Sequence, residues 1–147
     1  MQDKMQEVLQ SQSMCVLATV ADGKPHCSLM AYVFAPEERS IIMVTHRNTK
    51  KFQNVTENPQ VSLLIDTRLQ DGDEKRSYLK ALTVKGWCET IESQSESDRL
   101  KQLLLKSNRH LSEFVSHPEA AVIGVKVSSL QLLEGVNDSY FETFENT

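Results

Sequence analysis

Residues 40–66 constrain the fold more than any other stretch, because they hold two apolar runs with a polar corner and a short helical pattern between them. The first run, residues 40–45 (SIIMVT), is rich in β-branched side chains and predicts a strand. The second run, residues 61–65 (VSLLI), predicts another strand. Any helix between them must end before Asn58-Pro59, since the residue preceding a proline is pushed out of the helical region.

The polar corner, residues 46–51 (HRNTKK), opens that short helix. Asn48 or Thr49 can cap a helix that carries Phe52 and Val55. A helix that begins here points unpaired backbone N–H groups and the positive end of its dipole outward. The Thr49 hydroxyl and three cations lie beside those groups: Arg47, Lys50 and Lys51.

This combination of backbone, hydroxyl and cationic donors suits a phosphate group. The alternative is a solvated basic turn with an ordinary cap, and the hexapeptide taken alone favours that alternative. His46 is expected to lie at the surface, or to support the residues that touch a ligand without touching the ligand itself.

Composition narrows the classes of partner. The chain has 147 residues, which suit one domain spanning residues 1–147, and a net charge of −4 with a pI near 5.6. An acidic protein is a poor match for nucleic acid or for an anionic membrane. The sequence contains no apolar stretch of transmembrane length, and residues 1–10 are too polar for a signal peptide. We expect a cytoplasmic protein.

Cysteine and histidine spacing predicts no metal site. Cys15, Cys27 and Cys88 show no C-x-x-C spacing, and each lies in an apolar run. We expect buried, reduced thiols; a catalytic cysteine would need a neighbouring base that the sequence does not indicate. The four histidines, His26, His46, His110 and His117, share no ligand spacing.

The rest of the chain predicts mainly strands. An amphipathic helix over residues 1–10 precedes a strand at 14–20, the Asp22-Gly23 hairpin signal, and a second strand at 26–34. A turn at 36–39 leads into the strand at 40–45. A polar loop at 66–76, expected to be mobile, precedes a long strand at 77–91. Gly86 in this strand is expected to mark a bulge or a point of close backbone approach.

The C-terminal third predicts two helices and more strand. A serine-capped helix is expected at 96–107, a short helix at 110–115, and a last strand or strand pair at 120–127 and 130–133. The tail aromatics Tyr140, Phe141 and Phe144 are expected to pack on their own barrel or on a second subunit. The pattern indicates a mainly β protein, a six-stranded antiparallel barrel with peripheral helices.

Three segments together resemble the FMN-binding split-barrel family that includes pyridoxamine 5'-phosphate oxidase: CVLATVADGKPHCSLMAYVF, SIIMVTHRNTKKFQNVTENPQVSLLID and LTVKGWCETI. The most specific part is a strand that ends in Thr45, followed by Thr49-Lys50-Lys51 at a helix start and by NPQVSLL at residues 58–64. The resemblance implies a six-stranded antiparallel split β-barrel and a homodimer that holds FMN at its subunit interface.

The resemblance also implies which residues would bind the cofactor. Lys50 and Lys51 would hold the FMN phosphate, assisted by Thr49. The other positions implied to lie beside the flavin are Ser28, Leu29, Met30, Val44, Thr45, Asp66, Thr67 and Arg68. Trp87 is expected in the core or at a dimer contact.

Some positions depart from the oxidase itself. The oxidase has a cofactor-binding arginine at the start of its second strand, but no basic residue lies between His26 and Arg39. The oxidase's glutamine that precedes the valine of the long strand is replaced here, near Ala81. The chain also ends soon after its last expected strand. We therefore expect an FMN-dependent oxidoreductase of unidentified small-molecule substrate and not a true pyridoxamine 5'-phosphate oxidase. Two alternatives stay open: a non-catalytic flavin-binding or redox-sensing module, and a relative that uses deazaflavin or haem.

Overall fold

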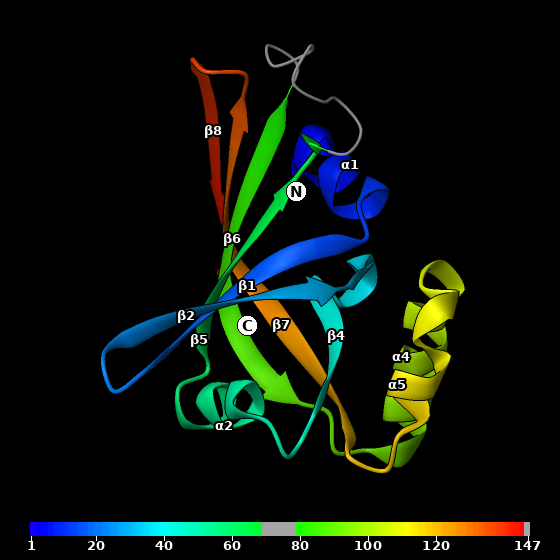
Figure 1. Ribbon diagram of the computed structural model, residues 1–147. Coiled ribbons are helices and arrows are strands. Elements are labelled where there is room, and N and C mark those ends of the chain that lie inside the picture. Colours follow the sequence, from blue (N-terminus) through cyan, green and yellow to red (C-terminus); the bar gives the residue numbers. More distant parts are fainter. Residues whose placement is uncertain (69–78, 146–147) are drawn as a thin grey trace.

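The computed structural model describes residues 1–68 and 79–145 and is built on one antiparallel sheet (Figure 1). The strands pair in the order β2-β1-β5-β6-β7-β4-β3, and β8 pairs with β7 beside this path. The mainly β, antiparallel fold class is confirmed. The strands are β1 (Met14–Ala21), β2 (Lys24–Ala31), β3 (Val33–Ala35), β4 (Ser40–His46), β5 (Gln60–Asp66), β6 (Lys80–Thr90), β7 (Ala120–Glu134) and β8 (Asp138–Thr143).

The predicted Asp-Gly hairpin joins β1 to β2. Asp22 and Gly23 both have positive φ, 53° and 72°, as a two-residue turn that matches the twist of its strands requires. The two strands then pair in register from Ala21 and Lys24 to Met14 and Ala31. This hairpin projects to the left in Figure 1.

The strand predicted at residues 26–34 is wrong as a single element, because the chain breaks at Tyr32 into β2 and β3. These two strands lie at opposite ends of the strand order, so one residue joins the two edges of the sheet. Tyr32 is buried, and its hydroxyl donates to the Leu9 carbonyl at 2.8 Å. The sheet curls because its edges must meet there, and α1 (Asp3–Ser11) packs Met5 and Leu9 into the core.

The expected strand or strand pair near the C-terminus is one long strand, β7, with an irregularity. Lys85 pairs with Ser129 and Gly86 pairs with Val127, so Ser128 is the extra residue. The Ser128 hydroxyl donates to the Lys85 carbonyl at 2.9 Å. Because of this bulge, β7 directs odd-numbered residues (Ile123, Val125 and Val127) into the barrel core before Ser128 and even-numbered residues (Leu130 and Leu132) after it. The irregularity predicted at Gly86 is confirmed.

The tail forms β8, a strand that the sequence did not predict. Tyr140 and Phe144 pack against the barrel core, which confirms one of the two expectations for the tail aromatics. Phe141 points the other way and is 64% exposed. From Tyr140 to Phe144, half-buried even-numbered residues alternate with exposed odd-numbered ones, and this alternation fits a strand with only one covered face.

Helices cover two parts of the barrel. After the Pro36–Glu38 turn (η1) and β4, helix α2 (Lys50–Glu57) lies at one end of the sheet. Helix α4 (Gln94–Ser107), capped by Ser93, is followed by the turn η3 (Arg109–Leu111) and by α5 (Ser112–Ser116). Figure 1 shows α4 and α5 side by side along one flank, where Leu100 and Leu104 pack on Ile42 and Val44 of β4.

Within the described residues, no helix is long and apolar enough to cross a membrane. The loop expected to be mobile at 66–76 falls, from residue 69 onward, outside the described residues.

Candidate functional site

The start of α2 forms as the sequence predicts, with Thr49 as its cap. The Thr49 hydroxyl accepts a hydrogen bond from the Phe52 N–H at 3.2 Å and donates one to the His46 carbonyl at 2.7 Å. Both contacts fix the turn, and the bond to the His46 carbonyl uses the single hydroxyl proton. Thr49 therefore shapes the corner, and the donors that remain for a ligand are backbone N–H groups and the lysines.

The two lysines of the corner point into different depressions. Lys51 lines a cavity of about 310 Å³ together with Leu29, Met30 and Val44. Lys50 lines a separate groove along α2, with Thr49 among its neighbours. The structure thus gathers four of the predicted cofactor residues in one cavity and leaves Lys50 outside it.

Lys51 is a half-buried cation without an anionic partner among the described residues. Its Nζ lies 3.1 Å from the sulfur of Met30, and a thioether is a weak acceptor. Burial disfavours the charged form and lowers the pKa of Lys51. None of the described residues that line the cavity is acidic. An anionic ligand group would therefore supply the partner that Lys51 lacks.

A second cavity, of about 430 Å³, adjoins the first and shares Met14 and Leu29 with it. Asp66 and Arg68 line this second cavity, and the Arg68 Nε donates to both Asp66 carboxylate oxygens at 3.0 Å. Arg68 is exposed, so this ion pair adds little stability. Both side chains are available to a ligand at the cavity mouth.

Three of the predicted cofactor positions, Thr45, Thr67 and Ser28, lie outside the lining of the two cavities. Thr45 and Thr67 are buried, and Thr67 Oγ1 accepts from the Lys80 N–H at 3.0 Å, which joins the end of β5 to the start of β6. Ser28 is half-buried on β2, two residues from Met30 and therefore on the same face of the strand.

His46 belongs to an aromatic stack that the sequence does not reveal. Its ring lies between those of Phe114 and His117, with centroid separations of 4.1 and 4.6 Å. His46 Nε2 lies 3.0 Å from the Phe114 carbonyl and donates to it, since a carbonyl oxygen only accepts. The Arg47 N–H also donates to the Glu119 carbonyl at 2.8 Å. These contacts, which we call the His46 clasp, tie the corner to α5.

The segment after α4 completes the wall of the 310 Å³ cavity. Leu104, His110, Leu111 and Phe114 line it alongside Lys51. Sequence reasoning missed these residues, because no motif links them to the corner, which lies about sixty residues earlier in the chain.

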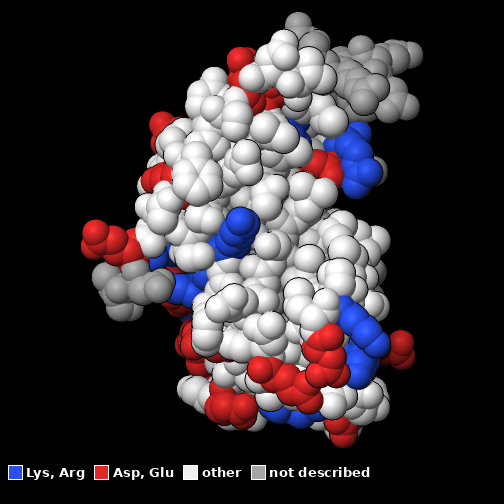
Figure 2. Space-filling model, turned by 90° about the vertical axis from the view of Figure 1, so that its left-hand side faces the viewer, with Lys and Arg blue, Asp and Glu red and all other residues white. Residues whose placement is uncertain are grey.

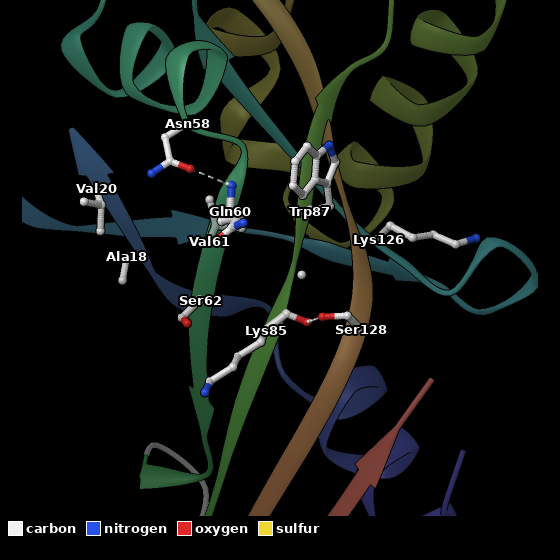
Figure 3. Close-up of a pocket in the computed structure, with 11 residues that line it drawn as sticks. Ala18, Val20, Asn58, Gln60, Val61, Ser62, Lys85, Trp87, Lys126 and Ser128 are labelled. Carbon is white, nitrogen blue, oxygen red and sulfur yellow. Dashed lines mark hydrogen bonds between the residues drawn. The ribbon is translucent and has the colours of Figure 1, made fainter. Parts of the chain in front are cut away.

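A third cavity, of about 710 Å³, lies on the outer face of the sheet, where Lys85, Gly86 and Trp87 from the middle of β6 line it (Figure 3). Lys85 and Trp87 project from the same side of β6, and Lys85 extends toward β5, where Ser62 lies. Trp87 is 53% exposed, so the expectation that it lies in the core is wrong and a dimer contact stays a prediction. None of the predicted cofactor residues lines this cavity.

The cysteines differ from one another. Cys15 and Cys88 are buried as expected, and burial raises the pKa of each thiol to about 12, so both stay protonated and unreactive near neutrality. Cys27 is exposed, which corrects the expectation of three buried thiols. It pairs with Ala18 on the outer face of the β1–β2 hairpin, so an apolar run did not guarantee burial. Among the described residues no cluster of histidine, cysteine and carboxylate side chains could hold a metal ion.

Charge is mixed on the surface. Figure 2 shows basic and acidic side chains interspersed, mostly toward the edges of the face in view, with a largely uncharged centre. Among the described residues in that view there is no broad basic area of the kind that binds nucleic acid. The basic corner is a local feature.

An antiparallel barrel closed through one residue defines a split-barrel protein, and the adjoining cavities beside the start of α2 are its candidate ligand site. The family model described as pyridoxamine 5'-phosphate oxidase matches residues 1–133, so the chain belongs to this family. A pyridoxamine 5'-phosphate oxidase homolog of Schizosaccharomyces pombe is 26% identical, over 89% of this chain and 84% of its own length.

Solved structures show the same fold. A heme binding protein from Mycobacterium smegmatis superposes with a TM-score of 0.82 at 16% identity; the match covers 97% of this chain and 59% of that protein. A FAD-binding protein from Mesorhizobium loti gives a TM-score of 0.72 at 15% identity, over 88% of this chain and 91% of that one. The split-barrel expectation is therefore confirmed.

Proposed function

We propose that this protein binds FMN and acts as a flavin-dependent oxidoreductase on a small molecule. One observation carries the proposal: Lys51, a half-buried cation with a lowered pKa, faces a cavity without acidic lining and has only the Met30 sulfur as partner. A phosphate monoester would provide charge-assisted hydrogen bonds there. The family match over residues 1–133 and the FAD-binding neighbour support a flavin as the ligand.

The residues present fit this cofactor. Lys51 and the unpaired N–H groups at the start of α2 would hold the phosphate, and Leu29, Met30 and Val44 would provide apolar contacts. The adjoining cavity, reached past Met14 and Leu29, would take the rest of the molecule beside Asp66 and Arg68. One cavity alone, at about 310 Å³, is at the small end of ligand sites, whereas the pair provides the room.

When bound, FMN would supply the redox chemistry, and the chain would supply binding, orientation and electrostatics. Lys51 would neutralise the phosphate, the Asp66–Arg68 pair would present polar groups at the mouth, and the apolar floor would exclude water. The buried thiols of Cys15 and Cys88 take no part, because they stay protonated.

We further propose that the protein is a homodimer and that its two subunits contact each other through the outer face of the sheet. Residues paired across an antiparallel ladder point to the same face. One such row crosses six strands through Leu29, Val16, Leu64, Thr83, Gln131 and Phe141. The large exposed apolar side chains on this face are Val20, Leu29, Leu64, Trp87, Leu133 and Phe141. An apolar area of this extent is typical of a surface that a partner covers.

The dimer bears on the site because Leu29 belongs both to this face and to the two ligand cavities. A second subunit on the outer face would therefore close the cavity mouth beside Asp66 and Arg68. This arrangement supports a cofactor held at the subunit interface.

The test is the absorbance spectrum of the purified protein, followed by titration of the ligand-free form with FMN, FAD and riboflavin. We expect flavin bands and a clear preference for FMN over riboflavin, because riboflavin lacks the phosphate. Binding of riboflavin as tightly as FMN would contradict the phosphate site. Turnover with a nicotinamide donor would separate an enzyme from a binding module.

A second candidate, haem binding, is favoured by the likeness to the heme binding protein from Mycobacterium smegmatis. The same spectrum distinguishes it. An intense haem band near the edge of the visible range, with no flavin bands, would replace the FMN proposal by this one.

A further inference from the structure

The cavity that holds Lys51 has a second nitrogen-bearing side chain that the resemblance does not assign. His110 of η3 lines the same cavity of about 310 Å³. It is exposed, and no hydrogen bond, ion pair or ring contact engages its ring within the described part of the chain. Two nitrogen donors from different elements thus face a space that has no acidic lining residue.

The position of His110 is fixed by buried contacts. Asn108 is 2% exposed, and its side-chain amide donates to the Leu104 carbonyl at 3.2 Å. Its own carbonyl accepts from the Leu111 N–H at 3.0 Å. These bonds hold the turn between α4 and η3 in one conformation, so His110 is presented by a rigid loop and not by a free one.

The elements that carry Lys51 and His110 are also tied to each other. The His46 clasp connects the end of β4, five residues before Lys51, to Phe114, four residues after His110. The Arg47 N–H bond to the Glu119 carbonyl adds a second connection. The separation between the two donors is therefore set by the fold before any ligand arrives.

We propose that His110 is a second ligand of the anionic group that Lys51 binds, so that FMN phosphate is held by one residue from α2 and one from the α4–α5 connection. This inference rests on the proposed function. An imidazole provides one N–H donor when neutral and two when protonated, and either form can bond a phosphate oxygen. The α4–α5 connection thereby becomes part of the cofactor site and not only a cover for β4.

The test compares His110→Ala with Arg109→Ala. Arg109 is the preceding residue in η3 and a full cation, but it does not line the cavity. Dissociation constants for FMN and for riboflavin are measured for both variants and the parent protein, with thermal unfolding as a check on folding. We expect His110→Ala to weaken FMN binding about tenfold, the loss typical of one charge-assisted bond, and to leave riboflavin binding unchanged.

Each outcome decides the question. Arg109→Ala should leave both constants within about twofold, and His110→Lys should restore most of the FMN affinity, since an ammonium also donates to phosphate. Unchanged FMN affinity in His110→Ala, or equal losses for FMN and riboflavin, would overturn the assignment while leaving the FMN proposal intact. A parent protein that binds FMN no better than riboflavin would remove the phosphate site, and the role of His110 with it.

Discussion

Lys51 is the residue at which binding and stability oppose each other. A lysine whose folded-state pKa is lowered is more easily deprotonated in the fold than in the unfolded chain. At neutral pH the charged form therefore costs stability, and this cost falls as the pH rises through the lowered pKa. A residue that destabilises the ligand-free protein, and has only a thioether beside its charge, is best explained by a ligand that it binds.

Lys51→Met should separate these two effects. We expect FMN affinity to fall at least about tenfold, because a charge-assisted bond to phosphate is lost, while the thermal midpoint of the ligand-free protein stays the same or rises. Calorimetry with and without FMN checks both. Lys50→Met is the matched control, since Lys50 lines the separate groove along α2 and its loss should change FMN affinity little. Equal effects of the two substitutions would indicate a diffuse charge effect and not a site.

At the scale of elements, the pairing of β6 with β7 joins the β2-β1-β5 part of the sheet to the β4-β3 part. Gly86 lies where the register shifts, and a Cβ there would clash with the Lys126 carbonyl and come within 2.7 Å of Val125 Cγ1. The two backbones approach so closely that only glycine fits. The bulge is thus built from a missing side chain on β6 and an extra residue, Ser128, on β7.

Gly86→Ala should therefore destabilise the fold by about 1–3 kcal/mol, the usual cost of inserting a group into a packed site. Gly124→Ala is the control on the neighbouring strand, where the nearest atom to an added Cβ is 3.5 Å away, an ordinary contact. Urea denaturation of the two variants measures the difference. Equal stabilities would show that the backbones separate without cost at the bulge.

At the scale of the whole molecule, the outer sheet face determines how the ligand cavities are closed. Leu29 is 70% exposed and Phe141 64% exposed, at opposite ends of one cross-strand row. A monomer in water would leave both side chains and the mouth of the second cavity uncovered.

Leu29→Glu with Phe141→Glu should convert the proposed homodimer to monomers and weaken FMN binding together, because both depend on the same face. Sedimentation and light scattering measure the assembly. Val136→Glu is the control: Val136 is 84% exposed, but it lies in the turn between β7 and β8 and not on the row. A parent protein that sediments as a monomer would refute the dimer directly.

Local chemistry determined much of this protein. The Asp22-Gly23 turn, the Thr49 cap, the stop at Asn58-Pro59 and the irregularity at Gly86 each follow from short-range sterics or a single hydrogen bond, and all four are present in the structure. Hydrophobic periodicity located the long strands for the same reason, since it reports burial of one face.

Tertiary structure decided what depends on distant partners. Tyr32 divides an apparently continuous strand because it must join the two sheet edges, and β8 forms only because β7 offers an unpaired edge for a tail with one apolar face. Lys50 and Lys51 are neighbours in sequence, yet the helix directs them into separate depressions. His110 comes to the cavity of Lys51 only because α4 and α5 pack on β4. A sequence pattern records which faces are apolar; which elements those faces meet depends on the closure of the barrel.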